Sequence, residues 1–197
     1  IIIYYLLWPS MWIQPGTTLE TVFRRGILLR VNRAHALPRF HRGELMVGDP
    51  GTLFYIDVLL LRTTFLTLPF SLVGYGAALV QRKNRALILL GSFAIFYFAQ
   101  MTLASKKESR YMLPVILAID VLSAWGVVWW AKRATFLRPA HLIGLVVLAQ
   151  AVVVLPRYPY YGTHYNTLMG GPQAARQILP LGYFGEGLDL AAQYVDS

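Results

Sequence analysis

The chain contains no cysteine and few charged residues. Among its 197 residues, 9 are Asp or Glu and 18 are Lys or Arg, so that only 14% are charged. The absence of cysteine excludes disulfides and thiolate metal sites. An ordinary soluble domain is about a quarter charged. A chain that is 56% apolar, with a mean hydropathy of +0.50, is better explained as a membrane protein.

Four long apolar runs indicate membrane-spanning helices, because each is close to the roughly 20 residues that a helix needs to cross about 30 Å of hydrocarbon. The predicted spans are 63–81, 86–105, 111–131 and 139–156, which together form a region from 63 to 156. Asp120 interrupts the third run. A carboxylate at that depth is costly, so we expect Asp120 to face the bundle interior, paired or protonated, in a structural role.

Both ends of the sequence resemble interrupted helices. Residues 1–9, "IIIYYLLWP", start abruptly in apolar sequence without the basic leader of a signal peptide, and we expect a truncated transmembrane helix there. The last residues end inside a helical pattern that has no Gly or Pro stop signal. The sequence therefore predicts a fragment of a longer protein.

Residues 10–62 are expected to form a loop that carries interfacial helices. Apolar residues at helical spacing predict an amphipathic helix from Thr18 to about Val31, capped at Thr17 or Thr18. A second helix, "TLFYIDVLLLR" from Thr52, leads into the first span. Such helices lie on the bilayer surface. The predicted fold class is therefore all-α: a polytopic transmembrane helical bundle with interfacial helices and an extracytoplasmic tail.

The tail, residues 157–197, is rich in tyrosine at its start and glycine further on. The tyrosines that follow the last span predict an interfacial belt, with carbohydrate stacking as the alternative. Within "GGPQAARQIL", Pro172 predicts the start of a short helix, and Gly170 and Gly171 would permit the turn before it.

Short basic loops predict the orientation of the chain. Residues 81–85 and 132–138 are basic and lack acids, as is typical of cytoplasmic loops. The loop 10–62, the segment 105–110 and the tail then lie on the extracytoplasmic side. That side also carries many Arg and Lys residues, so a count of positive charges alone does not settle the orientation.

Residues 105–110, which we call the charged link, join the second and third spans. An anionic ligand at the membrane boundary, such as a phosphate or a phosphorylated lipid headgroup, would explain why cations collect there. The alternative is that Lys106, Lys107 and Arg110 only anchor helix ends at the interface.

Several motifs occur in an order that resembles a known family. They are "LLWPSMW" with a proline after it at 6–15, "RFHRGELMVGDPGTLFY" at 39–55, "KKESRYMLPV" at 106–115, and "HYNTLMGGPQAA" followed by "LGYFGEGLDLAAQY" at 164–194. The chain resembles the C-terminal half of the GT-C membrane glycosyltransferases, in the branch of prokaryotic relatives of dolichyl-phosphate-mannose protein mannosyltransferases and of the lipid A aminoarabinose transferase. The most specific element is Lys-x-x-Arg-Tyr-x-x-Pro, which matches at Lys107, Arg110, Tyr111 and Pro114.

The resemblance implies a multi-pass enzyme of a prokaryotic plasma membrane. Such enzymes transfer a sugar from a polyprenyl-phosphate donor to a protein or lipid acceptor on the extracytoplasmic side, where fixed cations stabilise the phosphate that leaves. The expected substrate-binding residues are Lys106, Lys107, Arg110 and Tyr111, with weaker contacts from His41, Arg42 and Glu44. The family's catalytic base is an aspartate in an N-terminal half that this sequence does not match. We therefore assign no catalytic residue and expect the fragment alone to be inactive.

Other ligands and functions are less well supported. His41 and Glu44 could bind a divalent ion, but their spacing matches no pattern such as His-Glu-x-x-His, so no metal is assigned. The net charge of +9 could suggest nucleic acid, yet no nucleic-acid-binding module is recognisable. The alternative functions are a transporter or flippase for an anionic lipid or solute, and a non-catalytic membrane subunit. No internal repeat of the kind common in transporters is evident.

Overall fold

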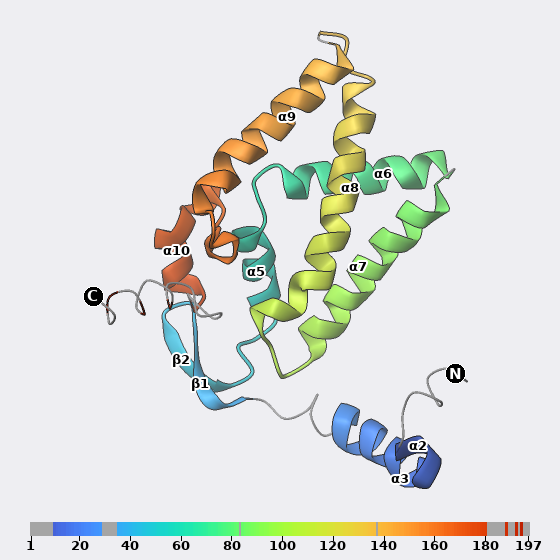
Figure 1. Ribbon diagram of the computed structural model, residues 1–197, viewed down its shortest axis with the longest axis vertical. Helices are drawn as coiled ribbons and strands as arrows, with labels where there is room; N and C mark the ends of the chain where they lie inside the picture. The colour runs from blue at the N-terminus through green and yellow to red at the C-terminus, as the bar shows by residue number, and fades with distance from the viewer. Residues whose placement is uncertain are drawn as a thin grey trace.

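The computed structural model describes residues 10–28, 35–82, 84–136 and 138–180, together with Leu188, Ala192 and Tyr194. Within these residues the protein is mostly helical, and its longest helices are α6 (Thr67–Gln81), α7 (Arg85–Leu103), α8 (Leu113–Ala131) and α9 (Pro139–Val154). Figure 1 shows α8 between α7 and α9, with α6 lying across it. The truncated span expected at 1–9 lies outside the described residues.

Three helices in the described ranges are long and apolar enough to cross a membrane. They are α7, α8 with the 3-10 helix η2 (Ser109–Met112) before it, and α9 with η3 (Leu155–Arg157) after it. Their 19, 23 and 19 residues correspond to about 28–35 Å of helix, close to the hydrocarbon thickness of a bilayer. The runs predicted at 86–105, 111–131 and 139–156 each correspond to one of these helices.

The outer faces of these helices expose large apolar side chains. Leu89 and Phe96 on α7, Leu117 on α8 and Leu148 on α9 are each at least 60% exposed. Contiguous apolar surface of this kind is unfavourable in water. The exposed faces are therefore compatible with a lipid environment around this part of the chain.

The run predicted as a span at 63–81 has a different structure. Its helix, α6, begins at Thr67 and has 15 residues, or about 22 Å, which is short of a bilayer's hydrocarbon thickness. Residues 63–66 separate it from α5 (Phe54–Arg62), and the two helices are bent by 102°. Thr63, in an extended conformation, ends α5 by donating its backbone N–H and its hydroxyl to the Leu59 carbonyl. A fourth crossing is present only if this bent pair is one broken span.

Close backbone contact joins α6 to α8. A Cβ added to Gly74 would lie 2.0 Å from the Leu122 carbonyl oxygen, and one added to Gly126 would lie 2.0 Å from the Phe70 carbonyl oxygen. Small residues at such a crossing let two helix backbones approach more closely than any side chain would permit. The crossing in Figure 1 therefore depends on these two glycines.

A two-stranded antiparallel sheet corrects the all-α prediction. It consists of β1 (His35–His41) and β2 (Glu44–Gly48), joined by Arg42 and Gly43. Both turn residues have positive φ, 51° and 88°, as in the tight turns that match the twist of a hairpin. The sequence does not predict the hairpin, because Arg-Gly is not one of the typical two-residue hairpin turns and polar His41 and Glu44 flank it.

The N-terminal surface helix starts earlier than predicted. After the short α2 (Ser10–Ile13), α3 (Pro15–Glu20) continues into a π-helical segment, η1 (Thr21–Leu28). Gln14 occupies the cap position and Pro15 the first turn, so the cap expected at Thr17 or Thr18 was wrong. Phe23 is 59% exposed, as expected of a helix that lies on a surface. The predicted end at Val31 lies outside the described residues.

The chain after α9 returns to α5. It forms the 3-10 helices η4 (Tyr161–Thr163) and η5 (Thr167–Met169), and then α10 (Gly171–Ile178). The prediction of a short helix here is confirmed, and Gly170 supplies the left-handed turn before it with φ of 86°. Asn166 binds the end of α5, since its backbone N–H donates to Leu61 O at 2.8 Å and its side chain donates to Leu60 O at 3.0 Å.

Replacing either crossing glycine should loosen the helix pair. Gly74→Ala or Gly126→Ala places a methyl group against a backbone carbonyl, which has no flexible side chain to move away, and we expect a loss of about 1–3 kcal/mol in unfolding free energy. The measurement is detergent-induced unfolding followed by circular dichroism. Gly76→Ala is the matched control on the same helix, because its Cβ would meet nothing within 4 Å. Equal losses in all three variants would contradict the crossing.

Candidate functional site

Lys107 of the charged link is buried and paired with an acid. The residue has 0% exposed surface, and its Nζ lies 2.6 Å from Asp49 Oδ1. The same carboxylate oxygen accepts a hydrogen bond from the backbone N–H of Gly51 at 2.8 Å. This bond orders the segment after β2. A buried ammonium is tolerated only when it is paired, so this contact fastens the link to the hairpin.

Glu108 brings two arginines together beside Lys107. Its two carboxylate oxygens pair with Arg39 Nη2 at 2.8 Å and with Arg110 Nε at 2.6 Å. Arg39 also donates to the Lys107 carbonyl at 3.2 Å, and the Glu108 backbone N–H donates to the Tyr55 hydroxyl at 3.2 Å. The charged link is therefore bound both to β1 and to α5.

A second cluster of charges joins the hairpin turn to α5. Asp57 accepts two hydrogen bonds from Arg42, at 2.7 and 2.8 Å, and lies 2.9 Å from His41 Nε2. Burial alone would raise the pKa of Asp57, but the hydrogen bonds and positive charge of Arg42 and His41 lower it below the ordinary carboxyl range. The carboxylate is therefore ionised at neutral pH, and the three residues act as a clamp.

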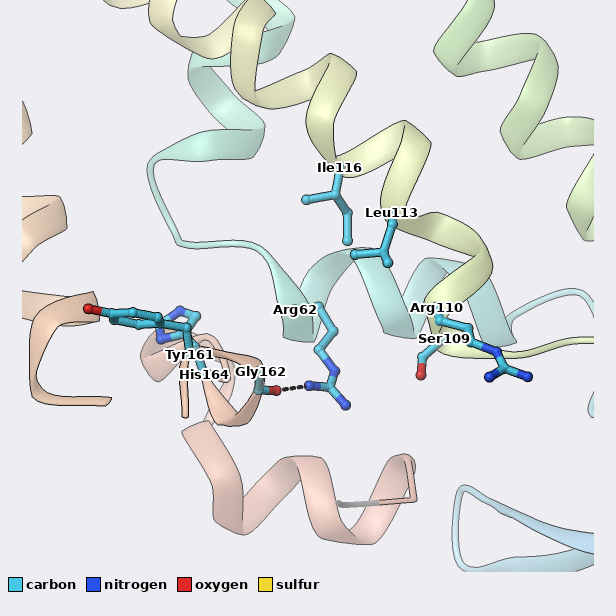
Figure 2. A pocket seen from close by; sticks show the side chains of 8 residues that line it. All are labelled: Arg62, Ser109, Arg110, Leu113, Ile116, Tyr161, Gly162 and His164. Carbon is cyan, nitrogen blue, oxygen red and sulfur yellow. Dashed lines mark hydrogen bonds between the residues drawn. The ribbon is translucent and has the colours of Figure 1, made fainter. Parts of the chain in front are cut away.

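A pocket of about 200 Å³ lies beside these clusters, between the end of α5, the start of α8 and the tail. We call it the cationic pocket, and Figure 2 shows the residues that line it. They are Arg62, Ser109, Arg110, Leu113, Ile116, Tyr161, Gly162 and His164. None of these residues is acidic, and Leu113 and Ile116 make one wall apolar.

Arg62 and Arg110 approach the cationic pocket from different sides. The Arg62 guanidinium donates a hydrogen bond to the Gly162 carbonyl, shown as a dashed line in Figure 2. It also lies over the ring of Tyr165, 4.4 Å from the ring centre. Its Nε is buried without a hydrogen-bond partner among the described residues. The Arg110 side chain is 52% exposed, and in Figure 2 its guanidinium points away from Arg62. Both guanidinium groups retain N–H groups that could donate hydrogen bonds to an anion.

His164 is the third nitrogen-bearing side chain of the pocket. It is 7% exposed, and neither ring nitrogen has a hydrogen-bond partner among the described residues. Burial lowers the pKa of His164, and the charges of Arg157 and Arg62 lower it further, so the ring is neutral at pH 7. A neutral imidazole can donate one hydrogen bond to a ligand and accept another.

The structure does not bring the seven predicted binding residues together in one site. Arg110 is the one of them that lines the cationic pocket. Lys107 is committed to Asp49, while Lys106 is partly buried and is not one of the lining residues. Tyr111 packs against the core formed by α5 and α8, with the Arg110 guanidinium 5.8 Å from its ring centre.

The hairpin residues form no joint binding site. His41 is 3% exposed and held by Asp57, Arg42 is held by the same carboxylate, and Glu44 is exposed on the outside of the hairpin. In the described ranges, no group of three His, Asp or Glu side chains could hold a metal ion. The structure thus gives His41 and Arg42 a visible role in attaching the hairpin to α5.

Sequence reasoning missed Arg62, Ser109 and His164. Arg62 ends the apolar run "FYIDVLLLR", and a lone basic residue at the end of such a run could have indicated a helix end at the membrane boundary. His164 is the first residue of the motif "HYNTLMGGPQAA", but nothing in that motif indicated a role for its side chain. Its place next to Arg62 follows from the tail folding back onto α5, which local sequence does not show.

Asp120 lies near the middle of α8 and lines a cavity of about 380 Å³ with residues of α6 and α9, among them Thr67 and Gln150. It is exposed rather than packed inside a closed core.

Comparison of the chain with protein-family models, curated proteins and solved structures finds no match.

Acid should weaken the clamp on α5. Because the pKa of Asp57 is lower in the folded protein than in an unfolded chain, its stabilising contribution is present above about pH 4 and is lost as the pH falls through the folded value. Asp57→Asn should cost roughly 1–3 kcal/mol at pH 7 and should flatten the decline of stability with acid.

The measurement is the midpoint of detergent-induced unfolding, determined at several pH values between 7 and 3. Glu20→Gln serves as the control, since the pair of Glu20 with Arg24 is exposed on the surface helix and contributes little. If the stability of Asp57→Asn falls as steeply with acid as that of the wild type, Asp57 is not the group that links stability to pH.

Proposed function

We propose that this chain is part of an integral-membrane glycosyltransferase, which transfers a sugar from a polyprenyl-phosphate donor to a protein or lipid acceptor on the extracytoplasmic face. The observation that carries the proposal is the cationic pocket. There the side chains of Arg62, Arg110 and His164 contribute to a lining that also has an apolar wall, at the start of a helix long enough to cross a bilayer.

The chemistry of the donor fits the composition of this pocket. A polyprenyl phosphate combines an anion with a long apolar tail, and its phosphate must be held at the membrane boundary. The guanidinium groups of Arg62 and Arg110 suit a phosphate, since each presents several N–H groups in a plane. Ser109 adds a hydroxyl at the same opening, as Figure 2 shows.

An apolar ridge on α8 leads away from the pocket. Leu113, Leu117 and Val121 follow one another at intervals of four residues, so they lie along one face of the helix, and they are 55%, 66% and 53% exposed. A polyprenyl chain whose phosphate sits in the cationic pocket could lie along this ridge. The pocket and the ridge together would thus hold both parts of the lipid, the phosphate and the apolar tail.

In the proposed reaction an acceptor oxygen attacks the anomeric carbon of the sugar while the bond between that carbon and the phosphate oxygen breaks. The negative charge grows on the departing phosphate, where Arg62 and Arg110 stabilise it. The acceptor's proton passes to a general base. The family resemblance implies an aspartate in the N-terminal half of such enzymes, and we give no described residue that role.

Lys107 has an indirect part in this proposal. Buried against Asp49, it keeps the charged link in place and so positions Ser109 and Arg110, two and three residues further on.

Neutralising the pocket should impair sugar transfer by the full-length protein. Arg62→Gln and Arg110→Gln each remove charged hydrogen bonds to the leaving phosphate, and we expect a loss of roughly 10- to 100-fold in kcat/KM. The measurement is transfer of radiolabelled sugar from a polyprenyl-phosphate donor. Arg24→Gln is the control, because Arg24 is exposed, pairs with Glu20 and lies outside the pocket.

Wild-type rates in both pocket variants would contradict the site. A wild-type protein that binds polyprenyl phosphate but transfers no sugar to any acceptor would instead favour the transporter or the non-catalytic subunit, which would use the same pocket for binding without chemistry.

A further inference from the structure

A second pocket lies at the other end of α8, away from the cationic pocket. Its volume is about 330 Å³, and it is lined by Gln81, Trp125, Val128, Trp129, Lys132 and Arg133. We call it the indole pocket. None of its lining residues carries a carboxylate, although Lys132 and Arg133 both carry positive charge.

The walls of the indole pocket hold more hydrogen-bond donors than acceptors. The Nε1 atoms of Trp125 and Trp129 are buried and have no hydrogen-bond partner among the described residues. An indole N–H can only donate, and leaving a buried donor unpaired is unfavourable. Both N–H groups are closed off with the rings in these positions, so a ligand with several acceptor oxygens would pair with them after the rings turn towards the pocket.

The two cations are arranged differently. The Arg133 guanidinium lies 3.8 Å from the centre of the Trp129 ring and donates to the Trp129 carbonyl at 3.2 Å, so its position is fixed. Lys132 is exposed at the end of α8 and can turn its ammonium towards the pocket. An anion held here would therefore meet one preorganised cation and one adjustable one.

The position of the pocket suits a ligand at a membrane boundary. Lys132 and Arg133 directly follow the last turn of the long apolar helix, and tryptophans in that turn are typical of the interface between hydrocarbon and headgroups. The orientation predicted from the basic loops puts this end on the cytoplasmic side, where anionic lipids are concentrated.

We propose that the indole pocket binds a phosphate-bearing anion, with Lys132 and Arg133 neutralising its charge and the indoles of Trp125 and Trp129 donating to its oxygens. The site does not depend on the glycosyltransferase proposal, because it shares no residue with the cationic pocket. An anionic phospholipid headgroup and free phosphate present the same chemistry, and the experiment distinguishes them.

The test measures binding of a fluorescent short-chain phosphatidylglycerol to the purified full-length protein in detergent. Lys132→Gln should weaken binding about fivefold, the effect expected for one basic residue at an anionic headgroup. Arg138→Gln is the matched control, since it removes the same charge from the same loop without touching the pocket. Trp125→Phe, which keeps an aromatic ring but removes the N–H, should also weaken binding.

Competition identifies the source of the anion. If unlabelled phosphatidylglycerol displaces the probe and inorganic phosphate does not, the ligand is a lipid headgroup; displacement by inorganic phosphate at similar occupancy supports a soluble anion. Equal affinities of Lys132→Gln and Arg138→Gln would overturn the proposal, because diffuse attraction to the basic loop would then explain binding. Equal binding of phosphatidylcholine and phosphatidylglycerol would also overturn it.

Discussion

Lys107 and Glu108, both buried, hold the segment before α8 against the hairpin through Asp49 and Arg39. These pairs join residues 58 and 69 positions apart in the chain. A buried charge that loses its partner costs several kcal/mol, so the segment can hardly leave this position while the protein remains folded. The start of α8, and with it one side of the cationic pocket, is fixed in consequence.

The clamp at Asp57 fixes the other side of the pocket. It attaches α5 to the hairpin turn, and Asn166 attaches the tail to the end of the same helix. Arg62 and His164 thereby face a common opening. At this end of the helices, Lys107, Arg39 and Arg42 are paired with acids within the fold, and Arg110 is paired with Glu108 but also lines the pocket beside Arg62.

Hydropathy predicted three of the long helices well, because a bilayer-length apolar run has few other structures available to it. It did not predict the structure at 63–81, where Thr63 interrupts the helical run after Arg62 and Gly74 lets α6 cross α8. The hairpin was missed because its turn has Arg42, a residue that rarely takes positive φ, in place of the usual Asn or Asp. The sequence predicted a group of cations before α8, and Arg110 among them lines the pocket, but it did not indicate Arg62, and it could not show that Lys107 pairs with Asp49, 58 residues away.

Affinity for the phosphate itself tests the central claim most directly. Binding of a polyprenyl phosphate to the full-length protein should be compared with binding of the polyprenol that has the same tail and lacks the phosphate. If the cationic pocket holds the anion, the phosphate form should bind at least about tenfold more tightly, and this preference should disappear in Arg62→Gln. Equal affinity of the two lipids for the wild-type protein would contradict the account.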